Sequence, residues 1–113
     1  MVNRNSGKFS ESTMNTTTDP RKAAIARMGE LTETVRQQPP GDVRASLLDE
    51  CEALTRAIEA FHMEGIRFRA YNVGRLLHKG GLPLPASAGD TFAQVRQHLE
   101  EAGFHTRSHQ SPV

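Results

Sequence analysis

The spacing of apolar residues between positions 47 and 61 constrains the fold of this chain more than any other feature. Five apolar side chains recur there at alternating intervals of four and three residues: Leu47, Cys51, Leu54, Ile58 and Phe61. An α-helix turns once in about 3.6 residues, so these intervals place all five on one side of a helix. The pattern predicts a helix that Asp42 caps and that Glu64-Gly65 ends.

A second apolar stripe precedes this helix and predicts a helical hairpin. It has the same spacing and consists of Ala24, Met28, Leu31 and Val35. Asp19 suits the N-cap of its helix, and Pro20 suits the first position because its φ is already fixed near the helical value. Residues 39–41, Pro-Pro-Gly, end this helix and allow only a short turn. The two helices are therefore expected to lie antiparallel.

Two more helices are predicted after Gly65. The first covers about residues 66–79, has Gly80-Gly81 as its C-terminal cap, and buries Ile66, Ala70, Val73 and Leu77. Residues 82–85, Leu-Pro-Leu-Pro, cannot be helical and are expected to lie extended across the core. The second helix covers about residues 90–102, with Ser87 or Asp90 as its cap, and buries Phe92, Val95, Leu99 and Ala102. The fold class is thus an all-α four-helix domain.

The length of 113 residues suits one domain, which we assign to residues 19–104. Only 5% of the residues are aromatic, so aliphatic side chains must form most of the core. Residues 1–18 are rich in Asn, Ser and Thr and are expected to be disordered, with Met14 as an alternative start of translation. Residues 105–113 are expected to form a flexible tail.

The sequence predicts a cytoplasmic protein that does not enter a membrane. No apolar run approaches the roughly 20 residues that span a bilayer, and residues 1–12 lack the apolar core of a signal peptide. The chain has one cysteine, which cannot form an internal disulfide.

No residue pattern predicts catalysis, a metal or a cofactor. Cys51 lies on a buried stripe between two glutamates, where a thiol is a core residue rather than a nucleophile. His105 and His109 have a spacing that brings them together only in a helix, and no helical pattern continues beyond Gly103. We therefore expect no enzyme, no metal site and no cofactor.

Charge is distributed unevenly, although the formal net charge is only +1. Residues 41–64 carry six acidic side chains and two arginines, whereas residues 65–80 carry three arginines, one lysine and no acid. The cations are part of a face at four-residue spacing that consists of Arg67, Tyr71, Arg75 and Lys79, with Arg69 and Asn72 beside it. Such a face can bind phosphates and base edges, an acidic protein partner, or the acidic helix of the same chain.

Residues 91–104 run Thr-Phe-x-x-Val-x-x-x-Leu-Glu-Glu-Ala-Gly-Phe. This segment resembles the recognition helix of winged-helix and other helix-turn-helix regulators, and with the preceding helix the resemblance covers about residues 70–104. It implies a helix-turn-helix-like pair that binds DNA, and Gln94 and Gln97 are included among the candidate contacts. The chain departs from the pattern in its long connection at residues 80–89 and in its net negative last helix, which is unfavourable against phosphate.

The sequence supports two functional hypotheses. The first is a small DNA-binding regulatory or accessory protein that grips double-stranded DNA through the basic helix. The alternative is a helical adaptor or inhibitor that binds a protein and no nucleic acid. In either case we expect a homodimer, because a small hairpin with two long apolar stripes has surface left to bury. Its predicted interface consists of Met28, Leu31, Val35, Leu47 and Leu54.

Overall fold

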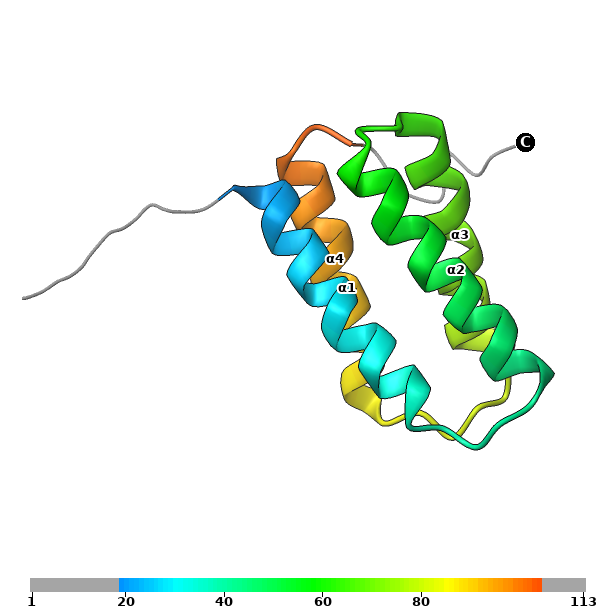
Figure 1. Ribbon diagram of the computed structural model, residues 1–113. Coiled ribbons are helices and arrows are strands. Elements are labelled where there is room, and N and C mark those ends of the chain that lie inside the picture. The colour runs from blue at the N-terminus through cyan, green and yellow to red at the C-terminus, as the bar shows by residue number, and fades with distance from the viewer. Residues whose placement is uncertain (1–18, 105–113) are drawn as a thin grey trace, which may run out of the picture.

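The computed structural model describes residues 19–104, which form a bundle of four α-helices (Figure 1). Their bounds are α1 Pro20–Arg36, α2 Asp42–Glu59, α3 Met63–Lys79 and α4 Ala86–Glu101. Each helix runs antiparallel to the one before it (Figure 1). Helix α1 packs closely on α2 and α4, and α2 packs on α3, whereas α3 and α4 make the loosest contact between sequential helices. The predicted all-α four-helix domain is confirmed. The predictions for residues 1–18 and 105–113 lie outside the described residues.

Helix α1 starts where the sequence predicts, with Asp19 as its N-cap. The carboxylate of Asp19 accepts hydrogen bonds from the backbone N–H groups of Arg21, at 3.0 Å, and Lys22, at 3.5 Å. Pro20 occupies the first helical position, where the missing N–H leaves no hydrogen bond unmade. At the far end of α3, Gly81 adopts a φ of 82°, a left-handed conformation that glycine tolerates without strain.

Three other predicted helix starts are wrong. Helix α3 begins at Met63 rather than near residue 66, so Glu64 and Gly65 lie in its first turn and do not end α2, which ends at Glu59. Gly41, not Asp42, is the N-cap of α2, and Asp42 is its first helical residue. Helix α4 begins at Ala86, four residues before Asp90, because the extended backbone at Pro85 already ends the preceding connection. Ser87 and Asp90 lie inside α4, and the cap position provides no side-chain hydrogen bond.

The core runs along the bundle between all four helices. Its largest fully buried side chains include Met28 and Leu31 of α1, Leu54 and Ile58 of α2, and Leu99 of α4. Residues 82–85 connect α3 to α4 without helix, as predicted, and Leu82 and Leu84 pack half-buried against this core.

Burial within one chain corrects the predicted dimer interface. All five residues assigned to it have no exposed surface: Met28, Leu31, Val35, Leu47 and Leu54. The hairpin alone would leave its stripes open, but α4 packs on α1 and α3 packs on α2, so the second pair of helices covers the first. A second copy of the chain is not needed to bury these side chains.

Phe61 is not a core residue, although it continues the α2 stripe in the sequence. Helix α2 ends at Glu59, and Phe61 adopts a φ of 57° in the turn to α3, which leaves the side chain 63% exposed. Its ring lies 4.3 Å from the guanidinium carbon of Arg21 and 6.1 Å from the ring of Phe104. The aromatic side chain thus covers one end of the bundle.

The α3–α4 pair has the geometry of neighbours in a bundle. Helices of a helix-turn-helix cross at about 90–120°, whereas α3 and α4 run antiparallel along the bundle (Figure 1). The arrangement therefore gives no support to the resemblance of residues 70–104 to a recognition unit.

Candidate interaction surface on α3

The outward side of α3 carries two exposed aromatic rings and two exposed cations. Phe68 is 47% exposed and Tyr71 41% exposed, and Arg75 and Lys79 are exposed as well. At about 100° per residue these four positions share one side of the helix, opposite its buried stripe. We call Phe68, Tyr71, Arg75 and Lys79 the α3 outer face.

This surface overlaps the face expected from the sequence without coinciding with it. Tyr71, Arg75 and Lys79 were expected and are exposed, whereas Arg67 is half-buried. Phe68 was not among the candidates. Its position midway between the buried Ile66 and Ala70 carried the signal, because at about 100° per residue Phe68 points away from both.

Arg69 forms an ion pair with helix α2. Its Nη1 lies 3.1 Å from Oε1 of Glu50 on α2, and its guanidinium carbon lies 5.1 Å from the centroid of the Phe68 ring. The ion pair joins the acidic segment of the chain to the basic segment. For Arg69, this agrees with the alternative in which the basic face binds the acidic helix of the same chain. Arg69 therefore links α2 to α3 beside the outer face, and we do not count it among the outer-face cations.

Asn72 is only 8% exposed, although it was expected to read base edges. It lies one turn from both Arg69 and Leu76, which are half-buried, and Arg69 contacts α2. Asn72 is therefore on the side of α3 that turns towards α2. A covered amide cannot reach a base edge, so Asn72 is removed from the candidate contacts.

Gln94 and Gln97 are exposed on α4. The side-chain amide of Gln97 donates to the carboxylate of Glu101 at 3.5 Å. Neither glutamine lines the groove between α3 and α4, whose α4 wall consists of Gly89, Phe92, Ala93 and Arg96. The structure thus does not join the two glutamines to the α3 outer face in one cleft.

Cys51 is a core residue, as predicted. Its side chain has no exposed surface, and burial raises the pKa of the thiol to about 12. A hydrogen bond with Thr32 lowers this pKa, and the charges of Glu50 and Glu52 raise it further. At neutral pH the thiol is therefore protonated, which does not suit a nucleophile or a metal ligand.

Residues 19–104 contain no group of three or more His, Cys, Asp or Glu side chains placed to hold a metal ion. His105 and His109 lie outside the described residues. In the described part of the chain no helix combines the length and the apolar character needed to cross a membrane.

No protein-family model, no curated protein and no solved structure matches this chain. Its function is therefore inferred from the geometry of its own residues.

Proposed function

We propose that this protein is a helical protein-interaction module, an adaptor or inhibitor, that binds an acidic protein partner through the α3 outer face. The observation that carries the proposal is the exposure of Phe68 and Tyr71 beside Arg75 and Lys79. Tyrosine and arginine are enriched among the residues that dominate binding energy at protein interfaces, and phenylalanine is enriched in interfaces generally.

The chemistry of the outer face favours a partner that offers both apolar and acidic groups. Covering exposed apolar surface stabilises a complex by about 25 cal/mol per Å² before the costs of association. Residues 65–80 contain no acidic side chain, so an acidic partner meets no like charge on α3 beyond Glu64 at its first turn. Complementary charge also accelerates encounter and discriminates against basic partners.

A small DNA-binding regulatory or accessory protein is the second candidate. It is favoured by the exposure of Tyr71, Arg75 and Lys79 along one helix face, where cations can meet phosphates. It ranks second because the exposed Phe68 ring has no counterpart in a phosphate backbone, and because Asn72 is covered. Helix α4 also presents more acidic than basic side chains, which phosphate would repel.

A binding comparison between two variants tests the first proposal. The outer-face variant carries Phe68→Ala, Tyr71→Ala and Arg75→Ala, and the control variant carries Lys22→Ala and Arg56→Ala, two exposed cations on α1 and α2. A protein that copurifies with the wild type is expected to remain with the control variant and to be absent from the outer-face variant. Purified separately, it should bind the wild type directly and be acidic on the surface it offers. A partner retained equally by both variants would contradict the proposal.

Duplex binding at low salt tests the second candidate. If Arg75 and Lys79 neutralise phosphates, replacing both with alanine should reduce the slope of log affinity against log salt by roughly one for each phosphate that is no longer neutralised. Undetectable duplex binding at low salt, where electrostatic association is strongest, would eliminate the DNA hypothesis.

A further inference from the structure

The outer side of α3 has an acid on one side of its two exposed aromatic rings and a cation on the other. Glu64, Phe68, Tyr71 and Arg75 follow one another at intervals of four, three and four residues, and all four are exposed. This is the spacing of the contact positions in a coiled coil, which lie along one side of a helix. Neither Glu64 nor Arg75 forms an ion pair within residues 19–104, so both charges are available to a second molecule.

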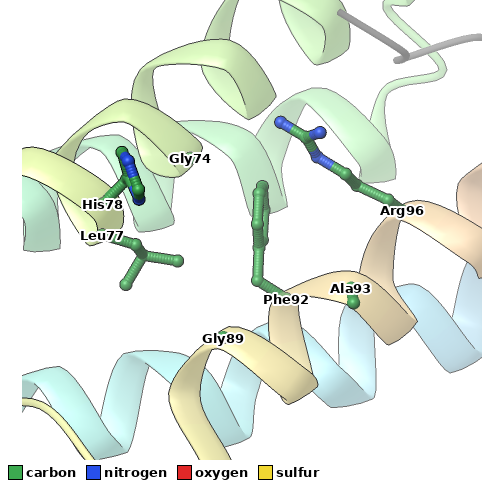
Figure 2. Close-up of a pocket in the computed structure, with 7 residues that line it drawn as sticks. All are labelled: Gly74, Leu77, His78, Gly89, Phe92, Ala93 and Arg96. Carbon is green, nitrogen blue, oxygen red and sulfur yellow. The ribbon is translucent and has the colours of Figure 1, made fainter. Parts of the chain in front are cut away.

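The neighbouring helices leave this side of α3 open. Helix α3 packs closely on α2 and only loosely on α4. At the loose seam, Phe92 of α4 extends towards Gly74 and Leu77 of α3 beside a groove of about 380 Å³ (Figure 2). Both contacts are made by the flanks of α3, so a further helix can lie along its outer side without displacing α2 or α4.

The order of the four residues makes this side of α3 complementary to itself. Two copies of α3 can lie antiparallel, with a twofold axis at the midpoint between Phe68 and Tyr71. Phe68 of each copy then faces Tyr71 of the other. Glu64 precedes Phe68 by four residues and Arg75 follows Tyr71 by four, so the same register places Glu64 of each copy opposite Arg75 of the other. One arrangement therefore covers both rings and joins each acid to a cation.

The charges select the antiparallel orientation. A parallel pair in register places Glu64 against Glu64 and Arg75 against Arg75, and like charges that face each other across an interface repel. The antiparallel pair replaces both repulsions with attractions, and it also opposes the dipoles of the two helices. Because the same patch is used on both copies, the contact is closed by its twofold axis and forms a dimer rather than a filament.

We propose that the chain forms an antiparallel homodimer through Glu64, Phe68, Tyr71 and Arg75 of α3. A helix of 17 residues offers a strip of roughly 25 by 10 Å. This strip is smaller than the area of about 800 Å² per partner in stable interfaces, so the dimer is weak and forms between chains that are already folded. It covers the α3 outer face, and self-association therefore excludes an acidic partner from that face. The homodimer goes beyond the proposed function and does not depend on it.

Sedimentation velocity of the full chain, from about 10 μM to about 1 mM, tests the dimer. The wild type should change from monomer to dimer within this range. Glu64→Arg and Arg75→Glu, each alone, bring like charges together across the twofold axis and should weaken the dimer about tenfold or more. Asp49→Arg and Lys22→Glu are the matched controls, because they make the same charge reversals at exposed positions of α2 and α1 and should dimerise like the wild type.

Exchanging the two charges tests the antiparallel register. The double variant with Glu64→Arg and Arg75→Glu has an acid opposite each cation again, but only if the helices are antiparallel, so it should recover the dimer that each single variant loses. The proposal is overturned if the wild type stays monomeric up to about 1 mM, if the single variants dimerise as well as their controls, or if the double variant does not recover. Far-UV circular dichroism verifies that each variant is folded.

One variant separates this inference from the proposed function. Glu64→Arg adds a cation to the outer side of α3, so it should lose the homodimer and still bind an acidic partner. A wild type that dimerises and has no acidic partner supports the homodimer alone. A wild type that binds an acidic partner and remains monomeric without it overturns the homodimer alone.

Discussion

Leu54 and Phe68 are both large apolar residues on amphipathic helices, and they occupy opposite environments. Leu54 has no exposed surface, whereas Phe68 is 47% exposed. Sequence spacing identifies the first, because Leu54 repeats with its neighbours on α2 at helical intervals. Phe68 lies off the α3 stripe, and its apolar character alone suggests burial. The two residues differ in exposure because they lie on different sides of their helices. Leu54 faces the core and stabilises the fold, whereas Phe68 faces solvent.

Alanine substitution should measure this difference. Leu54→Ala removes buried methyl groups and leaves a cavity, so it should lower the free energy of unfolding by about 2–5 kcal/mol. Phe68→Ala removes a larger side chain from the surface and should cost about 1 kcal/mol or less, including its interaction with Arg69. Urea denaturation of both variants provides the comparison. Similar losses of stability at the two positions would mean that Phe68 is part of the core.

The Cys51 thiol should make stability depend on alkaline pH. Its pKa is raised from 9.0 to about 12 by burial, so in this window the unfolded chain loses the proton while the folded chain keeps it. Stability of the wild type should therefore fall as pH rises above 9, by about 1.4 kcal/mol per pH unit from this group. Cys51→Ala removes the titration, and the difference between the two stability curves isolates it from other groups. Parallel curves above pH 9 would show that folding does not raise the pKa of the thiol.

Among the secondary-structure elements, the four helices were predicted better than their ends. The stripes on α1, α2 and α4 follow from residue spacing, and the end of α1 follows from Pro39-Pro40. The start of α4 was missed because Ser87 and Asp90 are good caps in isolation, whereas the backbone at Pro85 decides where the helix begins. The relation of α3 to α4 was missed for a different reason: local pattern does not encode the angle between two helices, which the packing of each on the hairpin determines.

The two aspartates at helix starts provide a matched pair for a capping prediction. Asp19 accepts two backbone hydrogen bonds at the N-cap of α1, and Asp42 lies in the first turn of α2 without capping it. Asp19→Ala should therefore lower the free energy of unfolding by about 0.5–2 kcal/mol. Asp42→Ala loses only a favourable interaction with the helix dipole, about 0.3–1 kcal/mol. If chemical denaturation gives a larger loss of stability for Asp42→Ala, the assigned start of α2 is wrong.

For the molecule as a whole, only part of the candidate interaction surface could be predicted from the sequence. The exposed cations Arg75 and Lys79 follow from charge and spacing. The ion pair between Arg69 and Glu50 and the burial of Asn72 both depend on the rotation of α3 about its axis relative to α2. The apolar pattern of one helix does not determine this rotation. The dimer interface was misassigned because the amount of apolar surface that four helices bury together cannot be judged from one hairpin.

Closure of the core within one chain leads to a prediction about concentration. Since Met28, Leu31 and Leu47 are fully buried in the single chain, folding should not require association. The thermal midpoint should therefore stay constant over a roughly hundredfold range of protein concentration, because mass action shifts stability only when folding is linked to binding. A midpoint that rises with concentration, measured by calorimetry, would show that association contributes to the fold.

Site-specific photo-crosslinking tests whether the α3 outer face meets a protein. Tyr71 is replaced by a photoreactive phenylalanine analogue of similar shape, with Gln94 of α4, also exposed, as the control position. We predict that irradiation in cells gives a discrete protein adduct from position 71, that the control position does not give it, and that Arg75→Glu abolishes it. Nucleic-acid adducts from position 71, or the same products from both positions, would contradict the proposed protein-interaction function.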